Sequence, residues 1–226
     1  MGGYSSDKAA LEQHEKTSER GSRRIALNLP NKLTLTRFVL TFIFILLLSY
    51  EHVVTYSAAY VVFVIATITD YYDGKIARSR NLVTNFGKLM DPVADKVLIS
   101  AAFIMLMLMG KDLYIPGWTV VVVIGREFLV TGARSLAASE GVVIGANRWG
   151  KTKAVFQMVY VYCFLGFVVL KELAIAAQLR LDYSLISSWL RWTSLFCAIA
   201  VAVYTVYSGV QFARINWGLL RLGEER

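Results

Sequence analysis

The sequence predicts an all-α membrane protein with six transmembrane helices. Three observations lead to this prediction: a high apolar content, six long apolar segments and an uneven distribution of lysine and arginine. Of the 226 residues, 56% are hydrophobic, and the mean hydropathy of +0.52 is too high for an ordinary soluble domain. Because about 20 helical residues cross a bilayer, the chain is long enough for about six spans.

The segments define one membrane domain with polar ends. Residues 1–27 are polar, carry mixed charge and are expected to form a flexible cytoplasmic tail. The first apolar segment is expected to be an uncleaved helix, because the polar stretch before it is long for a secretory signal and no clear cleavage site follows. We expect the domain to cover 28–215, with a short basic tail at 216–226. The apolar segments lie at 33–50, 57–78, 92–110, 116–138, 150–171 and 185–212.

The basic residues predict the orientation, because lysine and arginine are enriched on the cytoplasmic side of membrane proteins. With the N-terminus inside, twenty of the 24 lysines and arginines fall on that side. Both termini are therefore expected in the cytoplasm. Because the cations lie between apolar segments, anionic lipids and phosphorylated substrates explain the net charge of +8 better than nucleic acid does.

The cysteines and histidines narrow the range of metal sites. Cys163 and Cys197 fall inside apolar segments and are expected to be small buried hydrophobic residues, not a disulfide framework. His14 and His52 are too few for an imidazole-based zinc site. A site built from carboxylates favours a hard cation such as Mg²⁺ or Mn²⁺.

Four of the seven aspartates lie together where the second apolar segment ends and the third begins. Carboxylates beside hydrocarbon are costly unless they face a polar cavity, form ion pairs or bind cations. The alternative to a metal site is that they pair with neighbouring lysines and arginines. The four residues are Asp70, Asp73, Asp91 and Asp95.

The spacing of these aspartates suits two metal ions. The first pair is spaced i, i+3 and the second i, i+4, so each pair shares one face of a helix. Pro92 is expected in the first turn of its helix, where its missing N–H costs nothing. If the connection over 79–90 folds the helices side by side, their carboxylates can enclose two cations about 3.5–4 Å apart. Such a pair suits phosphoryl transfer, with Gly74 leaving room for a ligand and Arg78 reaching a phosphate.

A second group of cations follows the aspartate motif. We expect four of these cations to bind a phosphorylated acceptor beside the metal site. In the alternative interpretation, Arg126 pairs with Glu127 or Glu140, and the two lysines only determine the topology. The four cations are Arg126, Arg134, Lys151 and Lys153.

The pattern D-x2-D-G-x2-A-R-x8-G-x3-D-x3-D over residues 70–95 resembles the signature of the CDP-alcohol phosphotransferases at every fixed position. The resemblance extends over residues 28 to about 215 and implies a dimeric six-helix enzyme of the bacterial cytoplasmic membrane, with its active site facing the cytoplasm. Such enzymes transfer a phospho-group from a CDP-linked donor to an alcohol and release CMP. The stretches 31–37, 91–96, 126–134 and 150–153 resemble members that use CDP-diacylglycerol and glycerol 3-phosphate.

The resemblance also implies a role for each motif residue. Asp70 and Asp91 would bind both metal ions, with Mg²⁺ expected and Mn²⁺ as the alternative. Asp73 would complete the first metal site, while Asp95 would complete the second and accept the proton of the attacking hydroxyl. Contacts to the CDP moiety are implied for Asn31, Thr34, Gly74, Arg78 and Thr84.

Two other functions remain open. The acceptor could instead be inositol phosphate, serine or phosphatidylglycerol, although the cations at 126–153 favour an anionic, water-soluble molecule. A cation or proton transporter also uses intramembrane acids, but it typically places them near the midplane of repeated halves. The aspartates here lie at the ends of two segments, and the sequence contains no visible repeat.

Overall fold

A computed structural model describes residues 29–79, 85–139, 144–145 and 148–221 of the chain. These residues form six helices and no strand, which confirms the all-α prediction. The helices are α2 (Leu29–Leu48), α3 (Val53–Ser79), α4 (Asn85–Leu108), α5 (Gly117–Ser139), α6 (Arg148–Ala176) and α7 (Tyr183–Arg221).

Each predicted apolar segment corresponds to one helix, but α4 begins earlier than expected. It starts at Asn85, so Pro92 lies inside the helix and not in its first turn. A proline at this position removes the hydrogen bond to the carbonyl of Lys88. Helices in membrane proteins tolerate such a loss when neighbouring groups satisfy the freed carbonyl. At the other end of the chain, α7 continues to Arg221, past residue 215.

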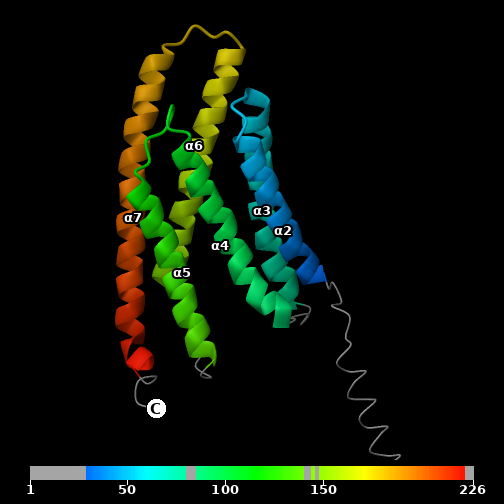
Figure 1. The fold of residues 1–226 in the computed structure, drawn as a ribbon, viewed down its shortest axis with the longest axis vertical. Coiled ribbons are helices and arrows are strands. Elements are labelled where there is room, and N and C mark those ends of the chain that lie inside the picture. Colours follow the sequence, from blue (N-terminus) through cyan, green and yellow to red (C-terminus); the bar gives the residue numbers. More distant parts are fainter. Residues whose placement is uncertain (1–28, 80–84, 140–143, 146–147, 222–226) are drawn as a thin grey trace, which may run out of the picture.

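The six helices run roughly lengthwise through the molecule (Figure 1). Helix α2 packs against α3 and α4, α5 packs against α4 and α7, and α6 contacts α3, α4 and α7. The starts of α2, α4 and α6 lie at one end of the bundle, together with the ends of α3, α5 and α7 (Figure 1). We call this the motif end, because the helix segments that carry the aspartates lie there.

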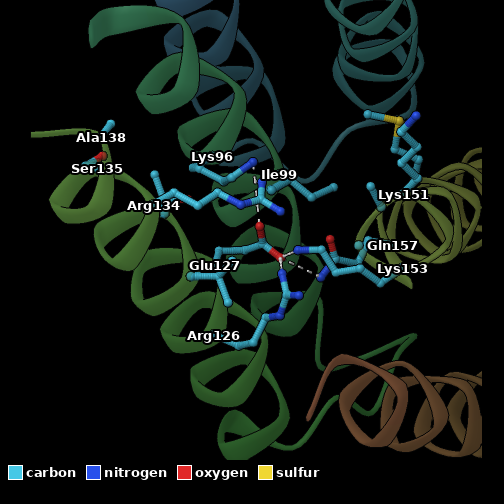
Figure 2. Close-up of a pocket in the computed structure, with 15 residues that line it drawn as sticks. Lys96, Ile99, Arg126, Glu127, Arg134, Ser135, Ala138, Lys151, Lys153 and Gln157 are labelled. Atoms are coloured by element: carbon cyan, nitrogen blue, oxygen red, sulfur yellow. Dashed lines mark hydrogen bonds and ion pairs between the residues drawn. The ribbon is translucent and has the colours of Figure 1, made fainter. Parts of the chain in front are cut away.

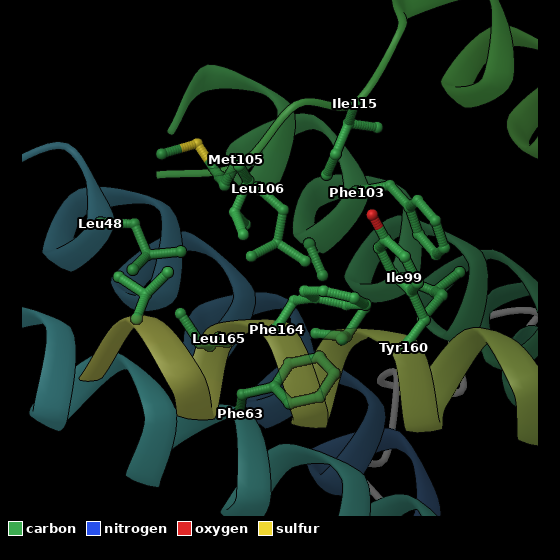
Figure 3. Close-up of a cluster of buried hydrophobic side chains, with 14 of the residues drawn as sticks. Leu48, Phe63, Ile99, Phe103, Met105, Leu106, Ile115, Tyr160, Phe164 and Leu165 are labelled. Carbon is green, nitrogen blue, oxygen red and sulfur yellow. The ribbon is translucent and has the colours of Figure 1, made fainter. Parts of the chain in front are cut away.

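The centre of the bundle is filled by large apolar side chains, which fix α4 and α6 relative to each other (Figure 3). Phe63, Phe103 and Leu165 are almost fully buried. The rings of Phe103 and Tyr160 are stacked with centroids 5.3 Å apart. The Tyr160 hydroxyl donates a hydrogen bond to the carbonyl of Ser194 at 3.2 Å, which connects α6 to α7. Large buried rings contribute strongly to packing, so this core holds the site helices in place.

The outer surface of the bundle is also apolar. Val121, Leu129 and Trp189 are each more than two-thirds exposed. Helices α6 and α7 each contain a stretch long and apolar enough to cross a membrane, and α2, α3 and α4 contain shorter apolar stretches. A soluble protein rarely exposes so much contiguous apolar surface, whereas a lipid-facing surface requires it.

The cysteines depart from the expectation of burial. Cys163 and Cys197 are free thiols and are exposed on the outside of the bundle. Both line an apolar groove between α6 and α7. An apolar segment predicts burial only when water surrounds the protein, and here the outward faces of the helices are apolar as well.

Ion pairs join the helices at the end opposite the motif end. Lys171 at the end of α6 pairs with Asp112 in the α4–α5 connection, and both side chains are mostly buried. Lys111 pairs with Glu51 between α2 and α3 on the exposed surface. Arg191 of α7 donates a hydrogen bond to the Gly110 carbonyl at 3.1 Å. These contacts close the bundle far from the aspartate motif.

Candidate active site

The backbone places the four aspartates of the motif on two helices at the motif end. Asp70 and Asp73 lie in α3, and Asp91 and Asp95 lie in α4, so each pair has the helical spacing that the sequence predicts. The end of α3 and the start of α4 both lie at this end (Figure 1), and only residues 80–84 separate them along the chain. The side chains of these aspartates, and those of Asn31, Thr34 and Arg78, lie outside the described residues, as does Thr84 altogether.

The chemistry of the donor set fits divalent metal ions. Four carboxylates provide oxygen ligands, which Mg²⁺ and Mn²⁺ prefer over nitrogen or sulfur. Among the side chains that the structure describes, no three histidine, cysteine or acidic groups gather to hold a metal ion. The aspartate motif is therefore the candidate metal site.

A pocket of about 510 Å³ lies between α4, α5 and α6 (Figure 2). Its lining contains five cations and, among the described residues, one carboxylate. The four cations predicted to bind the acceptor all line this pocket, and Lys96 of α4 joins them. The charged lining residues are Lys96, Arg126, Glu127, Arg134, Lys151 and Lys153.

The carboxylate of Glu127 lies at the centre of the charged contacts in this pocket. Its Oε2 faces Lys96 Nζ of α4 at 3.6 Å. Its Oε1 pairs with Lys153 of α6, lies 3.7 Å from Arg126 Nη1 and accepts a hydrogen bond from Gln157 Nε2 at 3.4 Å. Figure 2 shows Lys96, Arg126 and Lys153 directed toward Glu127 from three helices. One acidic side chain therefore connects α4, α5 and α6.

Residues of α7 contact the two arginines of the pocket. Arg126 Nη2 donates a hydrogen bond to Ser208 Oγ at 2.9 Å. A Cβ at Gly209 would lie 3.3 Å from Arg126 Cγ, so the absence of a side chain at Gly209 gives Arg126 room to pass. The guanidinium of Arg134 lies over the Phe212 ring, 5.3 Å from its centroid. These contacts restrict both long side chains before any ligand binds.

The pocket carries more positive charge than its own carboxylate can balance. Five cations face one acid among the described lining residues. The Nε donors of Arg126 and Arg134 are buried and have no hydrogen-bond partner among the described residues. Unbalanced charge in a mostly apolar bundle is costly, so the pocket is suited to an anionic ligand.

Three observations bear on the alternative interpretation of these cations. The Arg126–Glu127 pair that we considered is present, although it is long. Lys153 is 5% exposed, whereas a residue that only sets the topology would face the lipid headgroups or water. Lys151 is exposed at the rim of the pocket, so it suits either interpretation.

A model of the CDP-alcohol phosphatidyltransferase family matches residues 27–204. The chain belongs to this family. Members depend on metal ions and are associated with membranes, in agreement with the aspartate motif and the apolar helices. The family match therefore confirms the resemblance that the sequence motif indicates.

Three bacterial proteins illustrate what the chain is similar to within this family. The chain is 38% identical over 206 residues to the CDP-diacylglycerol–glycerol-3-phosphate 3-phosphatidyltransferase of Bacillus subtilis, covering 86% of this chain and 97% of that protein. It is 41% identical to the protein of the same name from Rickettsia prowazekii, over 60% of this chain and 73% of that protein. It is 39% identical to a probable phosphatidylglycerophosphate synthase of Mycobacterium tuberculosis, over 70% and 74% of the two chains.

The sequence alone does not indicate a site role for Glu127, Lys96 or Gln157. Both acidic Glu127 and basic Lys96 lie in stretches that resemble the family, at 126–134 and 91–96, and Glu127 was considered as a counterion for Arg126. An acidic residue in the middle of an apolar segment is a signal that could have indicated a functional role. The partners of that residue come from other helices, so its contacts required the structure.

Proposed function

We propose that this chain transfers the phosphatidyl group of CDP-diacylglycerol to glycerol 3-phosphate, giving phosphatidylglycerophosphate and CMP in phospholipid biosynthesis. The observation that carries the proposal is the cation pocket, which shares α4 with Asp91 and Asp95. Glycerol 3-phosphate is a dianion, and four positive charges remain in excess among the described lining residues. The names of the similar bacterial proteins support the same reaction.

The aspartates of the motif would hold two divalent ions, with Asp70 and Asp91 shared between them. Asp73 would complete one site, and Asp95 would complete the other. When bound, the ions neutralise the diphosphate oxygens of the donor. We propose Mg²⁺ as the ion, with Mn²⁺ as a substitute, because all four ligands are carboxylates.

The donor would bind at the motif end, near the start of α2 and the end of α3 (Figure 1). Gly74 lets the CDP moiety approach the α3 backbone, and Arg78 provides a planar set of donors for its phosphates. Asn31, Thr34 and Thr84 would complete the contacts to the nucleotide. The family resemblance supports these roles.

In the proposed reaction, Asp95 accepts the proton of the 1-hydroxyl of glycerol 3-phosphate. The hydroxyl oxygen forms a bond to the β-phosphorus of CDP-diacylglycerol. The bond between this phosphorus and the bridging oxygen breaks, and CMP leaves with that oxygen. Meanwhile Arg126, Arg134, Lys151 and Lys153 hold the acceptor phosphate, which orients the hydroxyl for attack.

We further propose that all six helices span the cytoplasmic membrane, with both termini and the motif end in the cytoplasm. The uneven distribution of lysine and arginine along the sequence supports this orientation. We also propose a homodimer, which the family resemblance supports. Modification of single cysteines with impermeant reagents tests the orientation, and cross-linking in membranes tests the dimer.

Another anionic acceptor, inositol phosphate, would also fit the charge of the pocket. The test is CMP release from CDP-diacylglycerol by the purified full-length chain, with glycerol 3-phosphate, inositol phosphate, serine and phosphatidylglycerol as acceptors. We expect glycerol 3-phosphate to give the highest kcat/KM. Turnover with serine but not with glycerol 3-phosphate would reject the proposed acceptor. Cation flux in proteoliposomes without CMP release would support a transporter instead.

A further inference from the structure

Glu127 lies in a pocket that otherwise gathers cations, although a carboxylate there should repel an anionic acceptor. Glu127 is 3% exposed, so its charge is not screened by bulk solvent. In electrostatic terms alone, the pocket would bind a phosphate more tightly without it. Its presence therefore requires an explanation beyond charge balance.

The two oxygens of Glu127 bind side chains from different helices. Oε2 faces Lys96 of α4 at 3.6 Å, and Oε1 pairs with Lys153 of α6 and accepts a hydrogen bond from Gln157 of the same helix. Lys96 directly follows Asp95 in α4. Glu127 therefore links the helix of the proposed base to the helix that supplies Lys153 to the acceptor pocket.

A lysine ammonium has three N–H donors on a flexible stem. One donor can bind Glu127 while another binds a phosphate oxygen. Held in this way, the lysines lose less conformational freedom when the acceptor binds. The lysines would also hold the phosphate at a fixed position relative to α4.

We propose that Glu127 is a positioning residue of the acceptor site: it orients Lys96 and Lys153 toward the acceptor phosphate and fixes that phosphate relative to Asp95. This inference rests on the proposed function. It concerns only the acceptor half of the reaction, because the contacts of Glu127 lie on α4, α5 and α6. The donor half should be insensitive to Glu127.

The test compares Glu127→Gln with Glu172→Gln in the purified full-length chain. Glu172 lies 3.7 Å from Lys171 at the opposite end of the bundle, so it provides the same chemical change away from the pocket. The measured quantities are KM for glycerol 3-phosphate, KM for CDP-diacylglycerol and Ki for inorganic phosphate as a competitor of the acceptor. A purely electrostatic role and a positioning role predict opposite signs for the change in acceptor KM.

For Glu127→Gln, we expect KM for glycerol 3-phosphate and Ki for phosphate to rise together, by about 10- to 100-fold. KM for CDP-diacylglycerol should stay within about twofold, because Glu127 acts only on the acceptor half of the reaction. Partial unfolding would give a different result, since it would lower kcat and leave both KM values unchanged. Glu127→Asp keeps the charge and should recover part of the loss. Glu172→Gln should resemble the wild type. An unchanged or lower acceptor KM in Glu127→Gln would overturn the proposal.

Calorimetry can measure the affinity for glycerol 3-phosphate in the absence of CDP-diacylglycerol. This measurement separates the inference about Glu127 from the proposed function. If the wild type shows no turnover, the proposed function fails, and weaker binding by Glu127→Gln still supports positioning. If the wild type turns over and the two proteins bind equally, positioning fails alone. Should Glu127→Gln not fold, Lys96→Met removes the ammonium that faces Oε2, and it must raise the acceptor KM while leaving the donor KM unchanged.

Discussion

Lys153 of α6 and Glu127 of α5 form an ion pair inside the bundle, where their side chains are 5% and 4% exposed. Removing two charges from water is costly, and the cost is recovered only when further contacts satisfy both groups. Here Gln157, Arg126 and Lys96 provide such contacts to the carboxylate. Because an apolar pair of similar size would be at least as stable, we interpret this arrangement as part of a binding site.

Asp95→Asn tests the proposed base. The amide cannot accept the hydroxyl proton, and we expect kcat for CMP release to fall by at least about 100-fold. The thermal unfolding midpoint should change little, since the helix remains intact. Near-normal CMP release by this variant would show that another group accepts the proton.

Arg134→Gln tests the acceptor pocket, with Arg191→Gln as a matched control. Both arginines lie over an aromatic ring, Arg134 over Phe212 and Arg191 over Tyr114, but Arg191 contacts the α4–α5 connection at the opposite end of the bundle. We expect Arg134→Gln to raise KM for glycerol 3-phosphate on the order of tenfold, from the loss of a charged hydrogen bond. Arg191→Gln should not change it. An equal effect of both variants would indicate a general loss of stability.

Gly209→Val tests the space that Arg126 occupies. The added side chain would meet Arg126 Cγ, which a Cβ alone would approach to 3.3 Å, and push the guanidinium away from Ser208. Since displacements near 1 Å can cost about 100-fold, KM for glycerol 3-phosphate should rise by up to that factor. Gly132→Val is the control, because a Cβ at Gly132 meets no atom within 4 Å among the described residues. Equal kinetics for the two variants would contradict the contact.

Asp112→Asn tests the ion pair at the opposite end. Lys171 would lose a mostly buried partner, and we expect destabilisation of about 1–3 kcal/mol, measured as a lower thermal unfolding midpoint. Both KM values should remain those of the wild type below the unfolding transition. A change in acceptor KM without a change in the midpoint would mean that this end of the bundle influences the pocket.

Much of the fold follows from local signals in the sequence. Long apolar segments separated by polar residues are sufficient to locate six helices, because helix formation and lipid exposure both depend on sequence-local composition. The start of α4 was misplaced because a proline usually marks a first turn, whereas here the helix continues through Pro92. The exposure of Cys163 and Cys197 was missed because apolar composition does not distinguish a core-facing residue from a lipid-facing one.

The site was predictable in its residue types but not in its contacts. Arg126, Arg134 and Lys153 were expected in an anion pocket because of their charge and their side of the membrane, and all three line one cavity. The links from Glu127 to Lys96 and Gln157 join residues about 30 positions apart on separate helices. Such contacts depend on helix rotation and packing, which the hydrophobic pattern does not fix.

The central claim is that the acceptor phosphate binds in the cation pocket beside metal ions held by the aspartate motif. The most direct measurement is the ³¹P relaxation rate of glycerol 3-phosphate bound to the full-length chain as Mn²⁺ replaces Mg²⁺. We expect Mn²⁺ to increase this rate strongly, with the increase lost in Asp91→Ala. Glycerol 3-phosphate that binds without any Mn²⁺ effect, or an effect that survives in Asp91→Ala, would contradict the claim.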